Sequence, residues 1–282
     1  MALNLKTLGT RTLSGIVFVI LLMGSVLFNY YSFTIFFFIV ALIGLSEFYK
    51  IAQKLNAQPY KIVGYLCASL VYFAFVNFSF LISNVYINFS YLLVLIPFII
   101  FSVALFSKQQ QPIKNAFFTL GGLLYAVLPF ALLNNLVIVN QANNNEFQFF
   151  PKVLLGIIFL IWSNDTFAYL GGSLFGKHKM IERVSPGKTW EGTIFGVLVS
   201  FGISFLIQRY FIQTQNNIWL ILGILVPILA TLGDLVESLL KRQAGIKDSG
   251  NIMPGHGGVL DRFDSLIFVS PFVYVIFKCL ST

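Results

Sequence analysis

The chain has 282 residues, of which 57% are hydrophobic and only 10% are charged, and its formal net charge is +8. A soluble domain carries about 25% charged residues, so this composition excludes a soluble globular protein and indicates an integral membrane protein. The basic residues are dispersed along the chain and form no single basic face, which argues against nucleic acid as a partner and fits the positive-inside rule.

The first apolar run follows Lys6 and Arg11, an arrangement that resembles a signal peptide. We interpret residues 13–31 as a retained span, because the run is too long for a signal peptide and no small-residue cleavage site follows it. A membrane helix needs about 20 predominantly apolar residues. On this criterion the sequence predicts an all-α protein with about nine transmembrane helices, at residues 12–30, 32–48, 62–83, 86–106, 115–139, 153–175, 193–212, 217–239 and 264–280.

The basic residues predict the orientation. With a cytoplasmic N-terminus, 15 of the 18 basic residues fall in cytoplasmic segments, and only Lys152, Arg209 and Lys278 fall outside. An odd number of spans then places the C-terminus outside. We therefore expect a multi-pass protein of the cell (inner or plasma) membrane, in contact with the lipid bilayer, with its acid-rich loops in the cytoplasm. Residues 1–150 would form an N-terminal bundle of about five spans, and residues 151–282 a catalytic region of about four.

Eight of the ten acidic residues lie after position 164, and ionisable groups near bilayer depth usually have a function. The first is Asp165, for which a structural role and a ligand role are both open. The basic loop at residues 176–192 contains Ser185, Lys188 and Thr189, which could bind a polyphosphate or a lipid headgroup. Its Gly-Lys-Thr sequence resembles the end of a P-loop, but that motif needs a glycine at position 182, which is glutamate.

The end of the eighth predicted span carries a polar helix face. Asp234, Glu237, Ser238 and Lys241 follow one another at helical spacing and would lie on the same side. Asp234 lies deep enough in the span to need a partner or a cation. For Glu237, an ion pair with Lys241 and a ligand role are both open.

The loop at residues 247–264 is rich in glycine, with four glycines and one proline at residues 250–258. Such a loop can bring its backbone close to a ligand and direct N–H groups at phosphate oxygens. Asp261 and Asp264 follow at the start of the last predicted span. As an isolated pair they would be helix-capping acids, but together with Asp234 they favour a metal site.

These residues resemble the phosphatidate cytidylyltransferases, also called CDP-diacylglycerol synthases. The resemblance covers residues 162–264 and includes the Ser-Pro-Gly-Lys-Thr-Trp-Glu-Gly segment at residues 185–192 and the Gly-Asp pair at residues 233–234. Met253 departs from the family signature, which usually has Leu, Ile or Phe there. The signature is met by Ser238, Lys241, Arg242, Lys247, Asp248, Gly250, His256, Gly257, Gly258, Asp261, Arg262 and Asp264.

The resemblance implies a membrane nucleotidyltransferase of phospholipid biosynthesis that joins its substrates CTP and phosphatidate and releases pyrophosphate. Mg²⁺ suits oxygen ligands and phosphate partners, and we expect Asp234, Asp261 and Asp264 to bind it, with a second cation and a homodimer left open. The expected catalytic residues are Asp234, Lys241, Arg242, Asp248, His256, Asp261, Arg262 and Asp264. The expected substrate-binding residues are Asp165, Ser185, Lys188, Thr189, Ser238, Lys247, Gly257 and Gly258.

Two other functions compete with this interpretation. An ion-coupled secondary transporter also contains intramembrane acids, but these usually lie near the bilayer midplane between two related halves. In this chain they gather toward one predicted cytoplasmic end. Another CTP-using membrane enzyme, such as a polyprenol kinase, is the nearer alternative. A purely structural protein would leave the loop at residues 247–264 unexplained.

Overall fold

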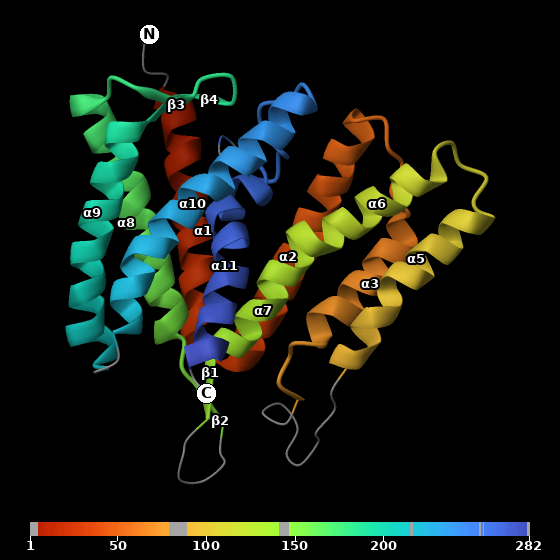
Figure 1. The fold of residues 1–282 in the computed structure, drawn as a ribbon, viewed down its shortest axis with the longest axis horizontal. Coiled ribbons are helices and arrows are strands. Elements are labelled where there is room, and N and C mark those ends of the chain that lie inside the picture. Colours follow the sequence, from red (N-terminus) through yellow and green to blue (C-terminus); the bar gives the residue numbers. More distant parts are fainter. Residues whose placement is uncertain are drawn as a thin grey trace.

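The computed structural model describes residues 5–78, 89–140, 147–214, 217–253, 255 and 257–280. Most of these residues are helical, and the longer helices run side by side between two ends of the molecule (Figure 1). The helices are α1 (Leu5–Phe28), α2 (Tyr30–Lys54), α3 (Lys61–Phe73), α5 (Leu95–Phe106), α6 (Pro112–Gly122), α7 (Leu128–Leu136), α8 (Lys152–Phe175), α9 (Trp190–Leu206), α10 (Ile218–Gln243) and α11 (Leu260–Leu280).

Shorter elements extend or connect these helices. A 3-10 segment, η1 (Ser90–Val94), leads into α5, while π-helical segments η2 (Leu123–Val127) and η3 (Ile207–Ile212) join α6 to α7 and prolong α9. The all-α prediction missed two antiparallel hairpins. One pairs β1 (Ile138–Asn140) with β2 (Phe147–Phe149), and the other pairs β3 (Lys179–Ile181) with β4 (Ser185–Thr189). Both hairpins lie between helices and leave the helical bundle intact.

Within the described residues, each predicted span coincides with helical segments, although the lengths differ. Five stretches are long and apolar enough to cross a membrane, namely Tyr30–Lys54, Pro112–Leu136, Lys152–Phe175, Trp190–Ile212 and Ile218–Gln243. The apolar helical segments Thr12–Phe28, Lys61–Phe73 and Ser90–Phe106 are shorter. α11 is of spanning length but begins with charged residues. The structure thus supports a multi-pass membrane protein.

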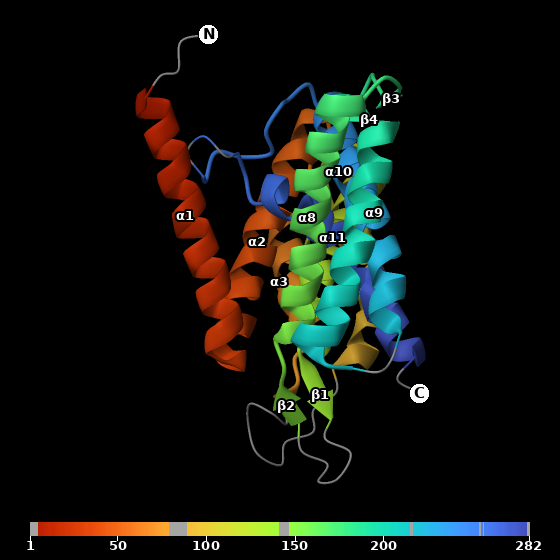
Figure 2. The same ribbon diagram turned by 90° about the vertical axis from the view of Figure 1, so that its left-hand side faces the viewer.

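The break between the first two helices is a capping box. Asn29 accepts a hydrogen bond from the Ser32 backbone N–H at 2.8 Å, and the Ser32 hydroxyl in turn accepts one from the Asn29 N–H. α1 therefore ends where α2 begins, and it lies along one side of the bundle (Figure 2). The Phe18 ring contacts Phe263 of α11 at a centroid distance of 5.5 Å, which ties α1 to the core.

The buried core joins the two halves of the chain. Phe37 of α2, Phe130 of α7 and Phe263 of α11 form a cluster with centroid distances between 5.4 and 6.2 Å. α10 approaches α11 closely at Gly233, where a Cβ atom would lie 2.7 Å from the Asp264 carbonyl oxygen. Only glycine permits this approach, so it brings the residue after Gly233 close to the start of α11.

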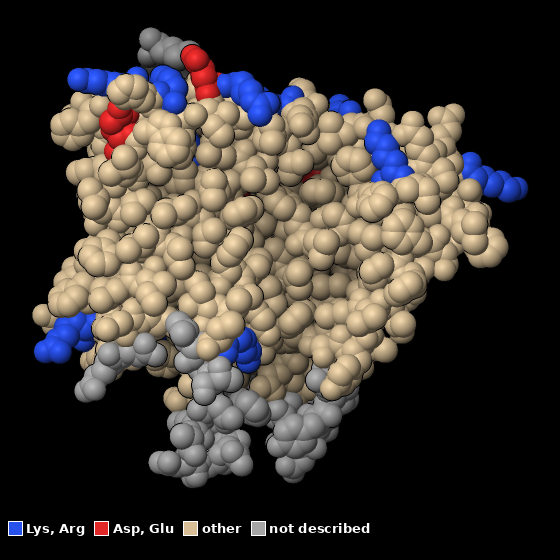
Figure 3. Space-filling view, viewed as in Figure 1, with Lys and Arg blue, Asp and Glu red and all other residues tan. Residues whose placement is uncertain are grey.

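The surface has a broad uncharged band between two polar ends. On the face shown in Figure 3, most Lys and Arg side chains gather along the edge above the band, where the β3–β4 hairpin lies, and few lie at the opposite edge. This distribution is typical of a membrane protein whose basic residues lie mainly on one side of the bilayer.

Candidate active site

Several of the polar side chains that the sequence singled out line two adjoining cavities of about 400 and 560 Å³. The walls come from the C-terminal half of α10, the start of α11 and the loop between these helices, and the smaller cavity is also lined by α1 and α8. Asp165 of α8 lines only the smaller cavity, whereas Lys247 and Asp248 line only the larger one. Both cavities are lined by Asp234, Met253, Asp261, Arg262 and Asp264.

The polar face predicted for the eighth span is present on α10. The Ser238 hydroxyl donates a hydrogen bond to Asp234 Oδ1 at 3.2 Å. One turn further, Lys241 Nζ lies 2.5 Å from Glu237 Oε2. The Lys241 side chain is only 14% exposed and that of Glu237 only 1%, so this ion pair is shielded from solvent and differs from a weak surface pair.

Three carboxylates converge between α10 and α11. Asp234, Glu237 and Asp264 each offer one oxygen atom, and these atoms all lie within 4.8 Å of one another. Glu237 Oε1 is buried and has no hydrogen-bond partner. A buried carboxylate oxygen without a donor is costly unless a cation compensates it. The oxygen-only donor set and this unsatisfied atom both fit Mg²⁺.

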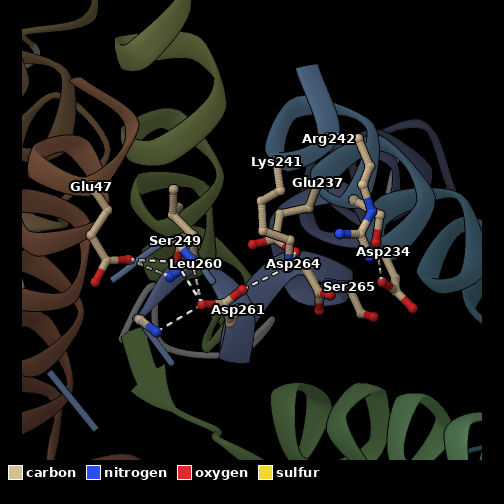
Figure 4. Close-up of polar contacts among 12 residues, drawn as sticks. Glu47, Asp234, Glu237, Lys241, Arg242, Ser249, Leu260, Asp261, Asp264 and Ser265 are labelled. Atoms are coloured by element: carbon tan, nitrogen blue, oxygen red, sulfur yellow. Dashed lines mark hydrogen bonds and ion pairs between the residues drawn. The ribbon is translucent and has the colours of Figure 1, made fainter. Parts of the chain in front are cut away.

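Asp261 lies outside this cluster of three carboxylates, although the sequence grouped it with Asp234 and Asp264 as a metal ligand. Its Oδ1 accepts a hydrogen bond from Lys241 Nζ at 2.6 Å. Its Oδ2 accepts from the Ser249 N–H at 2.8 Å, the Ser249 hydroxyl at 2.8 Å and the Gly258 N–H at 2.7 Å (Figure 4). Asp261 is one turn earlier in α11 than Asp264 and faces the loop, so Glu237 takes the third place in the cluster.

A fourth carboxylate, Glu47 of α2, comes from the N-terminal half of the chain. Glu47 is completely buried. Its Oε1 accepts a hydrogen bond from the Val259 N–H at 3.0 Å, and its Oε2 accepts from the Leu260 N–H at 2.9 Å. Sequence reasoning did not include Glu47 in the site. The signal was its position as the only acidic residue within a long apolar helix, because such residues are usually functional.

Glycines in the loop leave space for the carboxylates of Glu47 and Asp261. A Cβ atom on Gly250 or Gly258 would collide with the Glu47 carboxylate. Gly257 has φ +84°, a conformation that favours glycine.

The sequence suggested that the loop N–H groups bind phosphate, but in this structure four of them, at residues 249, 258, 259 and 260, donate to Asp261 and Glu47. His256, expected to be catalytic, lies outside the described residues.

The β3–β4 hairpin contributes one side chain to the acidic cluster. Lys188 of β4 extends to α10, where its Nζ lies 2.5 Å from Asp234 Oδ2. Thr189 has another role, since its buried hydroxyl accepts from the Gly192 N–H and caps α9. Ser185 pairs with Ile181 across the hairpin.

The remaining basic candidates lie at the border of the site. Arg242 donates from Nε to the Val184 carbonyl oxygen at 3.5 Å, which connects the end of α10 to the turn of the β3–β4 hairpin. Arg262 is exposed and lines both cavities, beside Asp261 on α11. The site therefore combines a compact acidic centre with several basic groups beside it, an arrangement suited to a cation together with phosphate-bearing ligands.

Comparison with known proteins extends over almost the whole chain. Residues 9–280 match the cytidylyltransferase family. The phosphatidate cytidylyltransferase of Staphylococcus haemolyticus (strain JCSC1435) is 33% identical over 271 residues, which cover 94% of this chain and 97% of the relative. That of Staphylococcus aureus (strain COL) is 37% identical over 186 residues, or 65% of this chain and 67% of the relative.

Proposed function

We infer that this chain, which belongs to the cytidylyltransferase family, converts CTP and phosphatidate to CDP-diacylglycerol and pyrophosphate. The observation that carries this conclusion is the convergence of three carboxylates with two lysines beside a pair of polar cavities. The names of the two Staphylococcus relatives supply the substrate and the reaction.

The chemistry requires two anions to be held together. A phosphatidate oxygen attacks the α-phosphorus of CTP, a P–O bond forms, and the bond to the β,γ-diphosphate breaks, so that pyrophosphate leaves with the bonding electrons. Phosphatidate is ionised near neutral pH, so no strong general base is needed. The protein must mainly position the reactants and offset the charge that develops on the α-phosphate and the leaving group.

The acidic centre and the lysines divide this task. Asp234, Glu237 and Asp264 would hold Mg²⁺, which supplies positive charge to phosphate oxygens. Lys241 is fixed between Glu237 at 2.5 Å and Asp261 at 2.6 Å, so it balances the buried negative charge at a constant position. Lys188 has one carboxylate partner, Asp234, and a side chain that is 25% exposed. It is therefore the lysine better placed to turn toward a triphosphate.

The lipid substrate fits the surroundings of the site. An apolar groove of about 570 Å³ runs between α1 and α2 and shares Phe18 and Met253 with the smaller polar cavity. Acyl chains in this groove would stay in the hydrocarbon layer while the headgroup reached the carboxylates. The basic edge of the molecule supports a cytoplasmic active site, with the N-terminus inside and the C-terminus outside (Figure 3).

Label transfer tests this proposal. The purified protein, reconstituted in vesicles that contain phosphatidate, is given Mg²⁺ and CTP labelled at either the α- or the γ-phosphate. We expect the α-label in the lipid fraction and the γ-label in released pyrophosphate, in equal amounts. A γ-label in the lipid would indicate a lipid kinase instead. If neither label were transferred, the result would contradict the proposal and favour a transporter.

A further inference from the structure

We propose that Glu47 is a positioning residue of the active site, which holds loop residues 249–250 and 258–259 and the start of α11 in their catalytic arrangement. This inference rests on the proposed cytidylyl transfer. Glu47 touches none of the three clustered carboxylates. It acts through the backbone and through Ser249, which connect it to Asp261 and Lys241 (Figure 4).

Backbone donors at the start of α11 surround the Glu47 carboxylate. The first N–H groups of a helix have no partner within the helix, and those of Val259 and Leu260 at the start of α11 instead donate to Glu47. The positive end of the helix dipole favours a carboxylate there. A side chain that is more than 200 residues away in sequence thus caps the helix that bears Asp261 and Asp264.

The loop fits closely around the Glu47 carboxylate. Gly250 and Gly258 both lie so close to Glu47 that a Cβ atom at either position would collide with its carboxylate. A side chain at either position would have to displace the Glu47 carboxylate, and at Gly258 also the Ser249 hydroxyl. This contact makes the loop conformation depend on a residue of α2, in the N-terminal half of the chain.

Ser249 connects Glu47 to the acidic centre. The Ser249 hydroxyl lies 3.1 Å from Glu47 Oε2 and 2.8 Å from Asp261 Oδ2. A hydroxyl has one hydrogen to donate, so Ser249 is shared between the two carboxylates. Asp261 then binds Lys241, and Lys241 binds Glu237 of the acidic cluster. Displacement of the loop would thus move Asp261 and, with it, the Lys241 ammonium group that neutralises Glu237.

The test replaces Glu47 by Gln, which keeps the size but presents an NH₂ group to donors. We expect kcat to fall about tenfold or more, the factor for one lost hydrogen bond to a charged group, with smaller changes in both KM values. Hydrogen exchange at the Val259 and Leu260 amides should become faster in Glu47→Gln. This second readout needs no substrate, so it separates a failure of this inference from a failure of the proposed reaction.

A double-mutant cycle distinguishes positioning from a general loss of stability. Because Ser249 connects Glu47 to Asp261, the effects of Glu47→Gln and Ser249→Ala on kcat should be non-additive. The matched control is Thr34→Val, which removes a buried hydrogen bond of α2 to Asn134, away from the loop. It should lower the thermal stability, leave kcat unchanged and be additive with Ser249→Ala. The proposal would be overturned if Glu47→Gln kept the wild-type kcat and the wild-type rate of amide hydrogen exchange. It would also be overturned if the effects of Glu47→Gln and Ser249→Ala on kcat were additive.

Discussion

Replacement of Asp261 by Asn keeps the shape of the side chain and removes its charge. In the structure, Asp261 accepts from Lys241 on one oxygen, and from Ser249 and Gly258 on the other. An asparagine has one oxygen and one NH₂ group. Whichever way its amide turns, a donor will face either the Lys241 ammonium or the backbone N–H groups of the loop.

The expected magnitude follows from the burial of this contact. The side chains of Lys241 and Asp261 are 14% and 8% exposed, so solvent screens their interaction little. A hydrogen bond to a charged group contributes about 1.5–3 kcal/mol, and about 1.4 kcal/mol corresponds to a factor of ten. We therefore expect Asp261→Asn to lower kcat roughly 10- to 150-fold.

The assay is steady-state cytidylyl transfer in detergent at saturating Mg²⁺, with the amount of folded protein checked by size-exclusion chromatography. Glu182→Gln is the matched control, because it also removes one carboxylate charge but from an exposed position in the turn between β3 and β4. It should retain wild-type activity. An Asp261→Asn protein that kept more than half of the wild-type kcat would refute the argument from buried hydrogen bonds.

Three further predictions concern other parts of the molecule. Lys188→Ala should raise the KM for CTP more than that for phosphatidate, since a triphosphate carries more charge; a change confined to phosphatidate would assign Lys188 to the lipid headgroup. Gly233→Ala should lower the unfolding free energy by about 1–3 kcal/mol through overpacking against α11, whereas Gly202→Ala, which meets no atom within 4 Å, should not; equal stabilities would contradict the close approach. A cysteine at Lys247 should react with an impermeant maleimide only from the cytoplasmic side, and one at Gln213 only from outside, and the reverse pattern would invert the proposed topology.

Much of the architecture could be predicted from local sequence. The helices fall where apolar runs of sufficient length occur, because a bilayer requires such runs. The polar face of α10 follows from helical periodicity, which fixes the relative directions of Asp234, Glu237 and Lys241. The β3–β4 hairpin was missed because its five-residue and three-residue strands carry no alternating apolar pattern.

The detailed arrangement of the site depends on contacts between distant segments. Periodicity places Asp261 and Asp264 near the same side of α11, yet it does not show that the loop would engage Asp261 and leave Asp264 beside Asp234. Glu47 is separated from its partners by more than 200 residues, so local sequence could mark it as unusual but could not identify what it binds. Such pairings require the tertiary structure.

The central claim is that Asp234, Glu237 and Asp264 form the metal site and that Asp261 does not. Electron paramagnetic resonance of Mn²⁺ bound to the purified protein tests it directly, with Mg²⁺ as a competitor. We expect the wild type and Asp261→Asn to bind Mn²⁺ tightly, and Asp234→Asn, Glu237→Gln and Asp264→Asn to lose this binding. Tight Mn²⁺ binding that survived Asp264→Asn and disappeared in Asp261→Asn would contradict the account.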